Sequence, residues 1–341
     1  MFNIENRRYV GNKYKLMDWI CEKILEECPN CKSFFDVFAG TGTVSGCMIN
    51  HYDKFIINDF LFSNEIIYNA FFSADEYDLS KLETLKHQYN NLDISKLGPN
   101  YISDNFGDKF FANNDALLIG YIREDLKQKH LKNEISDKEY AILLASLLYS
   151  ADRVANTCGH YDAYIKGKEI RAAFKYDLIQ PLETKGKKIE IYRCDANILA
   201  GKVISDIAFI DPPYNSRQYS RFYHVLENIA KWTKPELFGV ALKPKEENMS
   251  EYCRASAPKA FRDLIEKLNV KYIVVTYNNT YTSKSSSSRN KITLEQIQEI
   301  LENKGETKVF KKAHKCFNAG KTELPDHKEY LFITKVMNYE E

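Results

Sequence analysis

The sequence lacks the features that mark several large classes of protein. No apolar run approaches the ~20 residues needed to cross a bilayer, and the N-terminal stretch MFNIENRRYV becomes charged too early for a signal peptide. The eight cysteines are scattered, and the close pair Cys28 and Cys31 has no second pair or histidines at zinc-ligand spacing. The seven histidines show no ligand spacing either. We therefore expect a soluble, cytoplasmic protein with reduced cysteines, no metal and no membrane partner.

An excess of charge of one sign is also missing. In 341 residues, 48 Lys and Arg nearly balance 47 Asp and Glu, so the net charge does not point to a polyanionic partner. A nucleic-acid surface would have to be a local patch, and the candidates are the basic stretches 185–193, 283–291 and 311–315. Charge runs of this length are more often solvated faces, so they only support other evidence.

Two phosphate-binding motifs are absent as well. The stretch DVFAGTG places Gly40 and Gly42 where a strand turns into a helix, but Ser45 stands at the third position of G-x-G-x-x-G. No G-K-[ST] follows this turn, and the G-K-T at 320–322 has Lys315 where a P-loop needs its first glycine, so a P-loop is excluded. A tight glycine turn without an anion cradle suits a cofactor that carries a nucleoside and an amino acid but no phosphate.

The alternation of strand and helix patterns predicts an α/β fold, with a doubly wound, seven-stranded, mostly parallel sheet and an antiparallel edge. The strand patterns begin the stretches 32–50 and 54–72, recur at 187–197, 203–214 and 270–279, and end in a closing pair at 307–314 and 328–336. Capping signals at Ser256 and Thr293 mark two of the late helices.

Residues 75–185 interrupt this alternation. Asp36 and Asp211 are 175 positions apart, whereas three βα units of ~30 residues need about 90. The added segment is predicted to be largely helical, at 116–131 and at 136–156, where Ser136 and Glu139 form a capping box. The polar and aromatic loop 157–168 follows. We therefore divide the chain into a cofactor-binding half (1–74), an inserted domain (75–185) and a second catalytic half (186–341).

The stretch FIDPPYNSRQY (209–219) ends a buried strand with two prolines. Ligands bind at the carboxyl ends of parallel strands, and the prolines stiffen the backbone there. We expect the carboxylate of Asp211 and the carbonyl of Pro212 to accept hydrogen bonds from one amino group, and Tyr214, after Pro213, to offer a face to a planar base. Two such acceptors aim the lone pair of an aryl amine at an electrophile. The structural alternative is a rigid turn.

Two further acids end strands. Asp59 lies about 20 residues after the glycine turn, where a carboxylate can accept hydrogen bonds from ribose hydroxyls. Asp195 follows the third strand and suits the exocyclic amine of an adenine ring. For both residues a simple helix cap is the alternative interpretation.

Four blocks in this order resemble the S-adenosylmethionine-dependent adenine-N6 DNA methyltransferases of the DNA adenine methylase type. The blocks are RRYVGNKYKL (7–16), DVFAGTG (36–42), IINDF (56–60) and DPPY (211–214). The resemblance implies a seven-stranded methyltransferase sheet, and it implies that Asp211, Pro212, Pro213 and Tyr214 hold the target adenine. It further implies an S-adenosyl-L-methionine site lined by Tyr9, Lys13, Asp36, Phe38, Gly40, Gly42, Asp59, Asp195 and Asp211.

The resemblance also implies the reaction and its partners. A methyl group would pass directly to N6 of a flipped adenine in double-stranded DNA, within a restriction-modification system that has a cognate restriction endonuclease as candidate partner. The insert 75–185 would be the target-recognition domain. Arg217 and Tyr219, in a stretch that departs from the commonest family pattern, and Tyr277 would contact the substrate, with a core position as the alternative for Tyr277.

The insert also holds residues of types suited to DNA contact, although the sequence does not say which of them contact bases. These are Arg123, Arg153, His160, Tyr161, Tyr164, Lys166, Lys168 and Arg171.

Two rival functions use the same fold. Glutamine methyltransferases usually carry Asn at the place of Asp211, and RNA methyltransferases usually add a separate domain at a chain end, so the insert favours DNA. A binding protein without activity would be expected to lose Asp211 or the two glycines, and all three are present.

Overall fold

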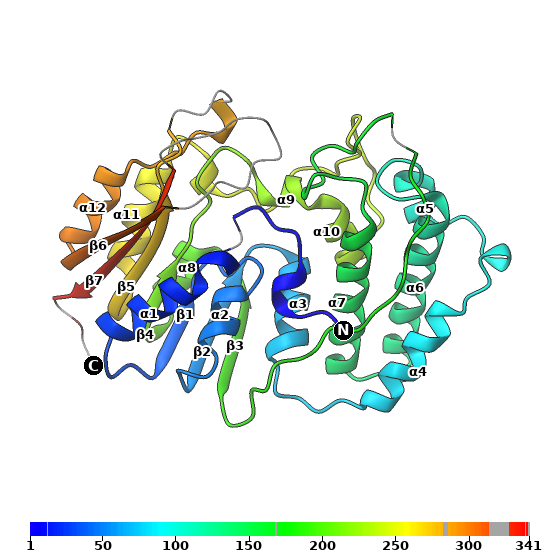
Figure 1. Cartoon of the computed structure of the whole chain (residues 1–341), viewed down its shortest axis with the longest axis horizontal. Helices are drawn as coiled ribbons and strands as arrows, with labels where there is room; N and C mark the ends of the chain where they lie inside the picture. Colours follow the sequence, from blue (N-terminus) through cyan, green and yellow to red (C-terminus); the bar gives the residue numbers. More distant parts are fainter. Residues whose placement is uncertain (12, 168, 282–285, 314–326, 338, 340–341) are drawn as a thin grey trace. The chain divides into compact units, whose positions relative to one another are not determined.

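The computed structural model describes residues 1–11, 13–167, 169–281, 286–313, 327–337 and 339 (Figure 1). The chain divides into two compact units. The first, which we call the helical unit, comprises Met1–Val10, Leu61–Lys185 and Ser220–Glu247. The second, the sheet unit, comprises Gly11–Phe60, Gly186–Tyr219 and Asn248–Glu341.

The sheet unit contains one seven-stranded sheet, as the strand patterns predicted. Its strands are β1 (Ser33–Asp36), β2 (Lys54–Asp59), β3 (Lys188–Arg193), β4 (Ile204–Ile210), β5 (Asn269–Asn278), β6 (Gly305–Ala313) and β7 (Lys328–Val336). They lie in the order β3-β2-β1-β4-β5-β7-β6 (Figure 1). The first five are parallel, and β7 is antiparallel to both β5 and β6. The predicted doubly wound, mostly parallel sheet with an antiparallel edge is confirmed.

The central strands are apolar along their length because both faces of the sheet are covered. Phe34 and Phe35 of β1 and Ile207 of β4 are fully buried. In β1, Phe34 pairs with Ile207 on one side and with Phe55 of β2 on the other. Continuous apolar runs, rather than alternating ones, are what such doubly covered strands require.

The helices of the sheet unit connect these strands. They are η2 (Tyr14–Leu16), α1 (Met17–Glu27), α2 (Thr43–Met48), α8 (Ala196–Ala200), η4 (Glu251–Cys253), α11 (Ala257–Lys267), η5 (Ser286–Ser288) and α12 (Leu294–Glu302). The predicted capping box of Thr293 with Gln296 is present at α12. Ser256 is the N-cap residue of α11, as predicted, but its backbone is already helical and its side chain makes no capping hydrogen bond. Its hydroxyl donates to Glu251.

The helical unit packs α3 (Phe62–Phe72) and α6 (Asn113–Leu131) against the buried α7 (Asp137–Val154). Its other helices are η1 (Ile4–Asn6), α4 (Leu79–Asn90), η3 (Ile94–Lys96), α5 (Tyr101–Phe106) and α10 (His224–Lys231). The short α9 (Tyr219–Phe222) begins at the last residue of the sheet unit. The predicted capping box of Ser136 and Glu139 starts α7.

The helical unit contains the whole predicted insert and extends beyond it to include α3 and α10. Helix α3 is attached to α10 because the Glu227 carboxylate of α10 accepts hydrogen bonds from the amides of Phe62 and Ser63. None of the described helices is both long and apolar enough to cross a membrane.

Candidate catalytic site

Four acidic residues follow neighbouring parallel strands of the sheet unit. Asp36 and Asp59 are the last residues of β1 and β2, Asp211 follows β4 directly, and Asp195 lies two residues beyond β3. Because β3, β2, β1 and β4 are adjacent and parallel, their carboxyl ends lie along one edge of the sheet. This edge is where ligands bind in open α/β sheets.

The glycine turn after β1 is fastened to the second strand. Gly40 and Gly42 have φ angles of 55° and 78°, in the left-handed region that side chains disfavour. The amide of Gly40 donates to Oδ2 of Asp59 at 3.0 Å, and the amide of Ala39 donates to the carbonyl of Asn58 at 2.9 Å. Asp59 therefore holds the turn as well as ending its strand.

Asp36 is buried and only half satisfied. The residue is only 1% exposed. Its Oδ2 accepts a hydrogen bond from the Ser45 hydroxyl at 2.7 Å. Oδ1 is buried and has no hydrogen-bond partner among the described residues. Burial raises the pKa of Asp36 to about 7, although the Ser45 hydroxyl opposes the shift. A ligand with a cationic amino group would supply the donor that this oxygen lacks.

Phe38 and Asp195 flank the same edge. The half-buried Phe38 ring packs edge-on against Tyr252, with centroids 4.9 Å apart. Asp195 caps α8, since Oδ1 accepts from the amides of Asn197 and Ile198. The structure thus shows the capping role that the sequence left open for Asp195, and both capping bonds end on one oxygen of the carboxylate.

Asp211 receives three hydrogen-bond donors on a single oxygen. Oδ1 lies 2.5 Å from the Tyr214 hydroxyl, 2.8 Å from the Thr276 hydroxyl and 3.1 Å from Nζ of Lys13. No hydrogen bond between described residues ends on Oδ2 of Asp211 or on the carbonyl of Pro212. The carboxylate is therefore fixed in orientation, while two acceptors at the strand end remain unengaged.

Lys13 lies between two carboxylates. Its Nζ is 2.9 Å from Oε1 of Glu329, and both side chains are nearly buried. The Tyr214 hydroxyl accepts from Lys13 at 2.7 Å and lies 3.1 Å from Oε1 of Glu329. Burial alone lowers the pKa of Lys13, but Asp211 and Glu329 more than offset this effect, and the pKa is raised. Burial and the same two carboxylates raise the pKa of Tyr214, so both groups keep their protons.

Tyr214 is held by its hydroxyl, its ring and its carbonyl. The ring packs against Tyr277 at 4.5 Å between centroids, and Nζ of Lys13 lies 4.8 Å from the ring centre. The carbonyl accepts from the amide of Lys291 at 2.8 Å and the hydroxyl of Tyr277 at 3.3 Å. Tyr277 is fully buried, which is the core position that the sequence left as its alternative.

The stretch after DPPY is clamped by Gln218. Its side chain accepts from the amide of Ser250 at 2.7 Å and donates to the carbonyl of the same residue at 3.0 Å. Arg217 is half-buried, and its amide donates to Oδ1 of Asn215. The hydroxyl of Tyr219 lies beside Gly11: a Cβ atom added to Gly11 would be 3.4 Å from it. The clamp fixes the backbone that carries Arg217.

Tyr9 belongs to the helical unit. Its ring stacks on Tyr223, with centroids 4.7 Å apart and an interplanar angle of 7°. The guanidinium of the buried Arg7 lies over both rings, at 5.2 and 5.4 Å. The other predicted cofactor residues belong to the sheet unit.

The insert candidates separate into buried and exposed residues. Arg123 is buried and donates to the carbonyls of Ile229 and Ala230, and Tyr161 is buried with its hydroxyl on Asp152. These two residues stabilise the helical unit. Arg153, Lys166 and Arg171 are exposed, and His160 and Tyr164 are half-buried. Lys168 lies outside the described residues.

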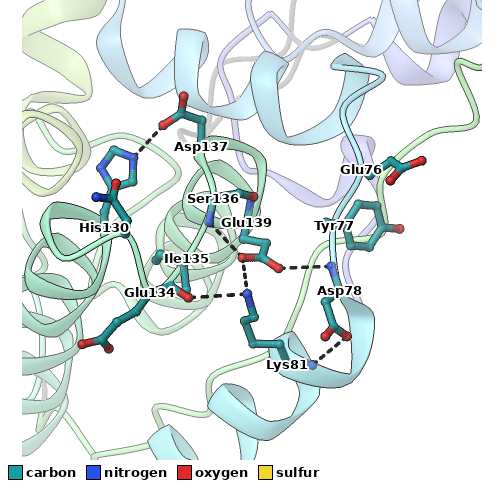
Figure 2. A pocket seen from close by; sticks show the side chains of 11 residues that line it. Glu76, Tyr77, Asp78, Lys81, His130, Glu134, Ile135, Ser136, Asp137 and Glu139 are labelled. Carbon is teal, nitrogen blue, oxygen red and sulfur yellow. Dashed lines mark hydrogen bonds and ion pairs between the residues drawn. The ribbon is translucent and has the colours of Figure 1, made fainter.

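A surface pocket of about 730 Å³ lies in the helical unit, between the start of α4 and the turn from α6 to α7 (Figure 2). Glu139 accepts from the amides of Asp78 and Ser136 and from Lys81, and His130 pairs with Asp137. These contacts are helix caps and surface ion pairs. The pocket contains none of the predicted site residues.

Sequence reasoning missed three residues that complete the site: Thr276, Gln218 and Glu329. Glu329 had a detectable signal, because strand alternation places it on the same buried face as Leu331 and Ile333 of β7. A carboxylate on a buried face requires a partner. Gln218 and Thr276 had no comparable signal, since their partners are remote in sequence.

Residues 9–282 match the family model for "D12 class N6 adenine-specific DNA methyltransferase". Modification methylase LlaI of Lactococcus lactis subsp. lactis is 33% identical over 80% of this chain and 46% of its own length. Type II methyltransferase M.FokI of Planomicrobium okeanokoites is 32% identical over 95% of this chain and 52% of its own. Type II methyltransferase M.CviAII of Paramecium bursaria Chlorella virus 1 is 30% identical over 96% of this chain and 98% of its own. The chain spans about half the length of the first two relatives and nearly all of the third.

Proposed function

Because this chain belongs to the D12 class of N6 adenine-specific DNA methyltransferases, we propose that it methylates N6 of a flipped adenine in double-stranded DNA, as the modification enzyme of a restriction-modification system. Enzymes of this class use S-adenosylmethionine as the methyl donor. One observation supports the proposal above all. Asp211 and Pro212 follow a parallel strand, and two of their acceptors, Oδ2 and the carbonyl oxygen, take no hydrogen bond from any described residue. The glycine turn follows the neighbouring strand β1.

The residues of the sheet edge fit S-adenosylmethionine. The buried Oδ1 of Asp36 has no donor among the described residues, and the cofactor's amino group would supply one. Gly40 and Gly42 let the backbone approach a ligand, Asp59 suits ribose hydroxyls, and Phe38 offers an apolar ring to the adenine. When bound, S-adenosylmethionine supplies an electrophilic methyl group.

Three further residues of the predicted cofactor site remain proposals. Asp195 would accept the cofactor's adenine amine with the oxygen that its capping bonds leave, and Tyr9 is proposed as a further cofactor contact. For Lys13 we propose a place on the catalytic side, because its ammonium group contacts Asp211, Tyr214 and Glu329.

The catalytic residues act by position. We propose that Oδ2 of Asp211 and the carbonyl of Pro212 accept the two N6 hydrogens and turn the nitrogen lone pair toward the methyl group. The charge of Asp211 then stabilises the positive charge that N6 acquires. Pro213 stiffens the turn, and Tyr214 flanks the base, supported by the buried Tyr277. Arg217 and Tyr219 would contact the DNA beside the extruded base.

We propose the insert 75–185 as the target-recognition domain, and within it the segment 162–175. This segment lies between two fully buried tyrosines, Tyr161 and Tyr176. At its far end, Asp115 accepts from the amides of Ala173 and Phe174, and Asn90 bonds both the amide and the carbonyl of Tyr176.

The described residues of this segment are mostly exposed, and its sequence is basic. Its sequence holds four basic residues (Lys166, Lys168, Arg171, Lys175) and two acidic ones (Asp162, Glu169), a net charge of +2. The Arg171 side chain is 85% exposed. A long irregular segment on a rigid scaffold is a common place for recognition residues, and its positive charge suits phosphate contacts.

A restriction endonuclease that cuts the same site, and a cytoplasmic location alongside cellular DNA, belong to the same proposal. The names of the relatives support both parts of the proposal, because these proteins are described as a modification methylase and as type II methyltransferases. Methylation of RNA or of protein glutamine is the alternative, although Asp stands at position 211.

The test is methyl transfer from labelled S-adenosylmethionine to DNA, tRNA and protein, followed by nucleoside analysis. We expect label in DNA as N6-methyladenine, and no transfer by the variant Asp211→Ala, which circular dichroism should show to be folded. Label only in RNA or protein would refute the proposal. Replacing residues 162–175 with those of a relative should change the methylated sequence, and unchanged specificity would place recognition elsewhere.

A further inference from the structure

Glu329 is a buried acid in the interior of the sheet. It lies in β7, paired with Asn278 of β5 on one side and Lys312 of β6 on the other. Its side chain is 3% exposed. A buried carboxylate is costly unless it is paired and hydrogen-bonded, and here its Oε1 contacts Lys13 at 2.9 Å and the Tyr214 hydroxyl at 3.1 Å. Both partners also contact Asp211.

We infer that Glu329 is a positioning residue for methyl transfer, which holds Lys13 and Tyr214 on one oxygen of Asp211 and balances the charge of Lys13. The inference rests on the proposed function, because it assigns Glu329 a task only if Asp211 receives the target amine. The geometry carries it: two of the three donors on Oδ1 of Asp211 are the two groups that Glu329 contacts.

The charges of the cluster show why a second carboxylate is needed. One ammonium group lies between two carboxylates, so Lys13, Asp211 and Glu329 together carry a net charge of −1. Without the charge of Glu329, Lys13 and Asp211 would form a neutral pair. The target nitrogen becomes positive as the methyl group bonds to it, and a neutral pair would stabilise that charge less.

The geometry of the cluster leads to the same result. Thr276 reaches Oδ1 from β5, independently of Glu329. Lys13, by contrast, contacts both Asp211 and Glu329, and the Tyr214 hydroxyl lies 2.5 Å from Oδ1 of Asp211 and 3.1 Å from Oε1 of Glu329. If the Glu329 carboxylate were absent, the ammonium of Lys13 could move toward Oδ2 of Asp211 and compete with the target amine for it.

The direct test is the variant Glu329→Gln, compared with Glu295→Gln, a carboxylate-to-amide control at an exposed position in α12. The DNA is a duplex containing the methylated site, found by mapping methylation in cells that express the protein. We expect the single-turnover rate to fall about 10- to 100-fold, because misplacing a reacting group by ~1 Å can cost about 100-fold. The control should stay within twofold of the wild type.

Two readouts separate positioning from general damage. The dissociation constant for DNA and the fluorescence of 2-aminopurine at the target position, which reports base flipping, should be unchanged in Glu329→Gln. In the background of Lys13→Met, adding Glu329→Gln should slow the reaction less than it does in the wild type, because the contact with Lys13 is already lost and the contact with Tyr214 remains. Glu329→Asp, which keeps the charge, should be faster than Glu329→Gln.

Several outcomes would overturn the inference. One is a Glu329→Gln rate within twofold of the wild type; others are a parallel loss of DNA affinity, additive effects in the double variant, or Glu329→Asp as slow as Glu329→Gln. If the wild type methylates DNA and any of these results is obtained, the role of Glu329 is refuted but the proposed function is not. A wild type that leaves DNA unmethylated refutes the proposed function, and the inference with it.

Discussion

Asp36 makes the stability of the sheet unit depend on pH, and the variant Asp36→Asn should remove that dependence. The ordinary pKa of this carboxyl is 3.8, and burial raises it to about 7 in the folded protein. An acid with a raised folded pKa contributes most stability below pH 4, where it is protonated in both states. The contribution is lost progressively as pH rises from about 4 to about 7, because only the unfolded state ionises freely.

The magnitude follows from the size of the shift. A shift of about three units at ~1.4 kcal/mol per unit is about 4 kcal/mol when the loss is complete. At pH 5 the protein has lost only about 1.6 kcal/mol of this stability, which corresponds to about 1.2 of the three pH units. The unfolding free energy of Asp36→Asn relative to the wild type should therefore rise by about 2–3 kcal/mol between pH 5 and pH 8.

The assay is urea denaturation of both proteins at pH 5 and pH 8, without cofactor, followed by circular dichroism. Asn can keep the contact with Ser45, so the comparison isolates the charge. Ser45→Ala serves as a control, because it removes the hydrogen bond and keeps the carboxyl group. A difference between Asp36→Asn and the wild type that stays constant, or shrinks, from pH 5 to pH 8 would refute the assignment of a raised pKa to Asp36.

Three further predictions test other parts of the molecule. The buried Lys138 donates to the carbonyls of Asn69, Ala70 and Ser73 at the end of α3. The variant Lys138→Met should therefore lower the unfolding free energy, measured by urea titration, by about 2–4 kcal/mol. A loss of under ~1 kcal/mol would contradict this capping role. Gly40→Ala should lower the affinity for S-adenosylmethionine at least tenfold by calorimetry, since its φ is 55°; unchanged affinity would separate the turn from the cofactor. Arg171→Ala should reduce the slope of log affinity for DNA against log salt by about 1, whereas an unchanged slope would mean that Arg171 does not contact phosphate.

Sequence patterns predicted most of the sheet unit because local chemistry dictates it. Apolar runs ending in acids gave the parallel strands, and the glycines of DVFAGTG gave a turn with positive φ angles. Capping boxes gave the starts of α7 and α12. The Ser256 side chain makes no capping bond because a nearby acid, Glu251, takes its hydroxyl. Each success concerns residues within a few positions of one another.

The contacts that complete the site could not be predicted in the same way. Lys13 was expected on the cofactor, yet it pairs with Asp211 and Glu329, which lie 198 and 316 positions away (211 − 13 and 329 − 13). A motif gives the type of a residue and its element, but its partners depend on strand order and register. The same reason hid the contact between α3 and Glu227, which joins Leu61–Lys185 to Ser220–Glu247 in one compact unit.

The protonation states of the cluster limit how the proposed reaction can proceed. Lys13 and Tyr214 both have raised pKa values, so near neutral pH each keeps its proton and neither can remove one from N6. Asp211 already accepts three hydrogen bonds on Oδ1, which leaves Oδ2 and the Pro212 carbonyl for the amine. The arrangement therefore favours methyl transfer to a neutral, oriented amine first and loss of its proton afterwards, when the methylated nitrogen has become strongly acidic.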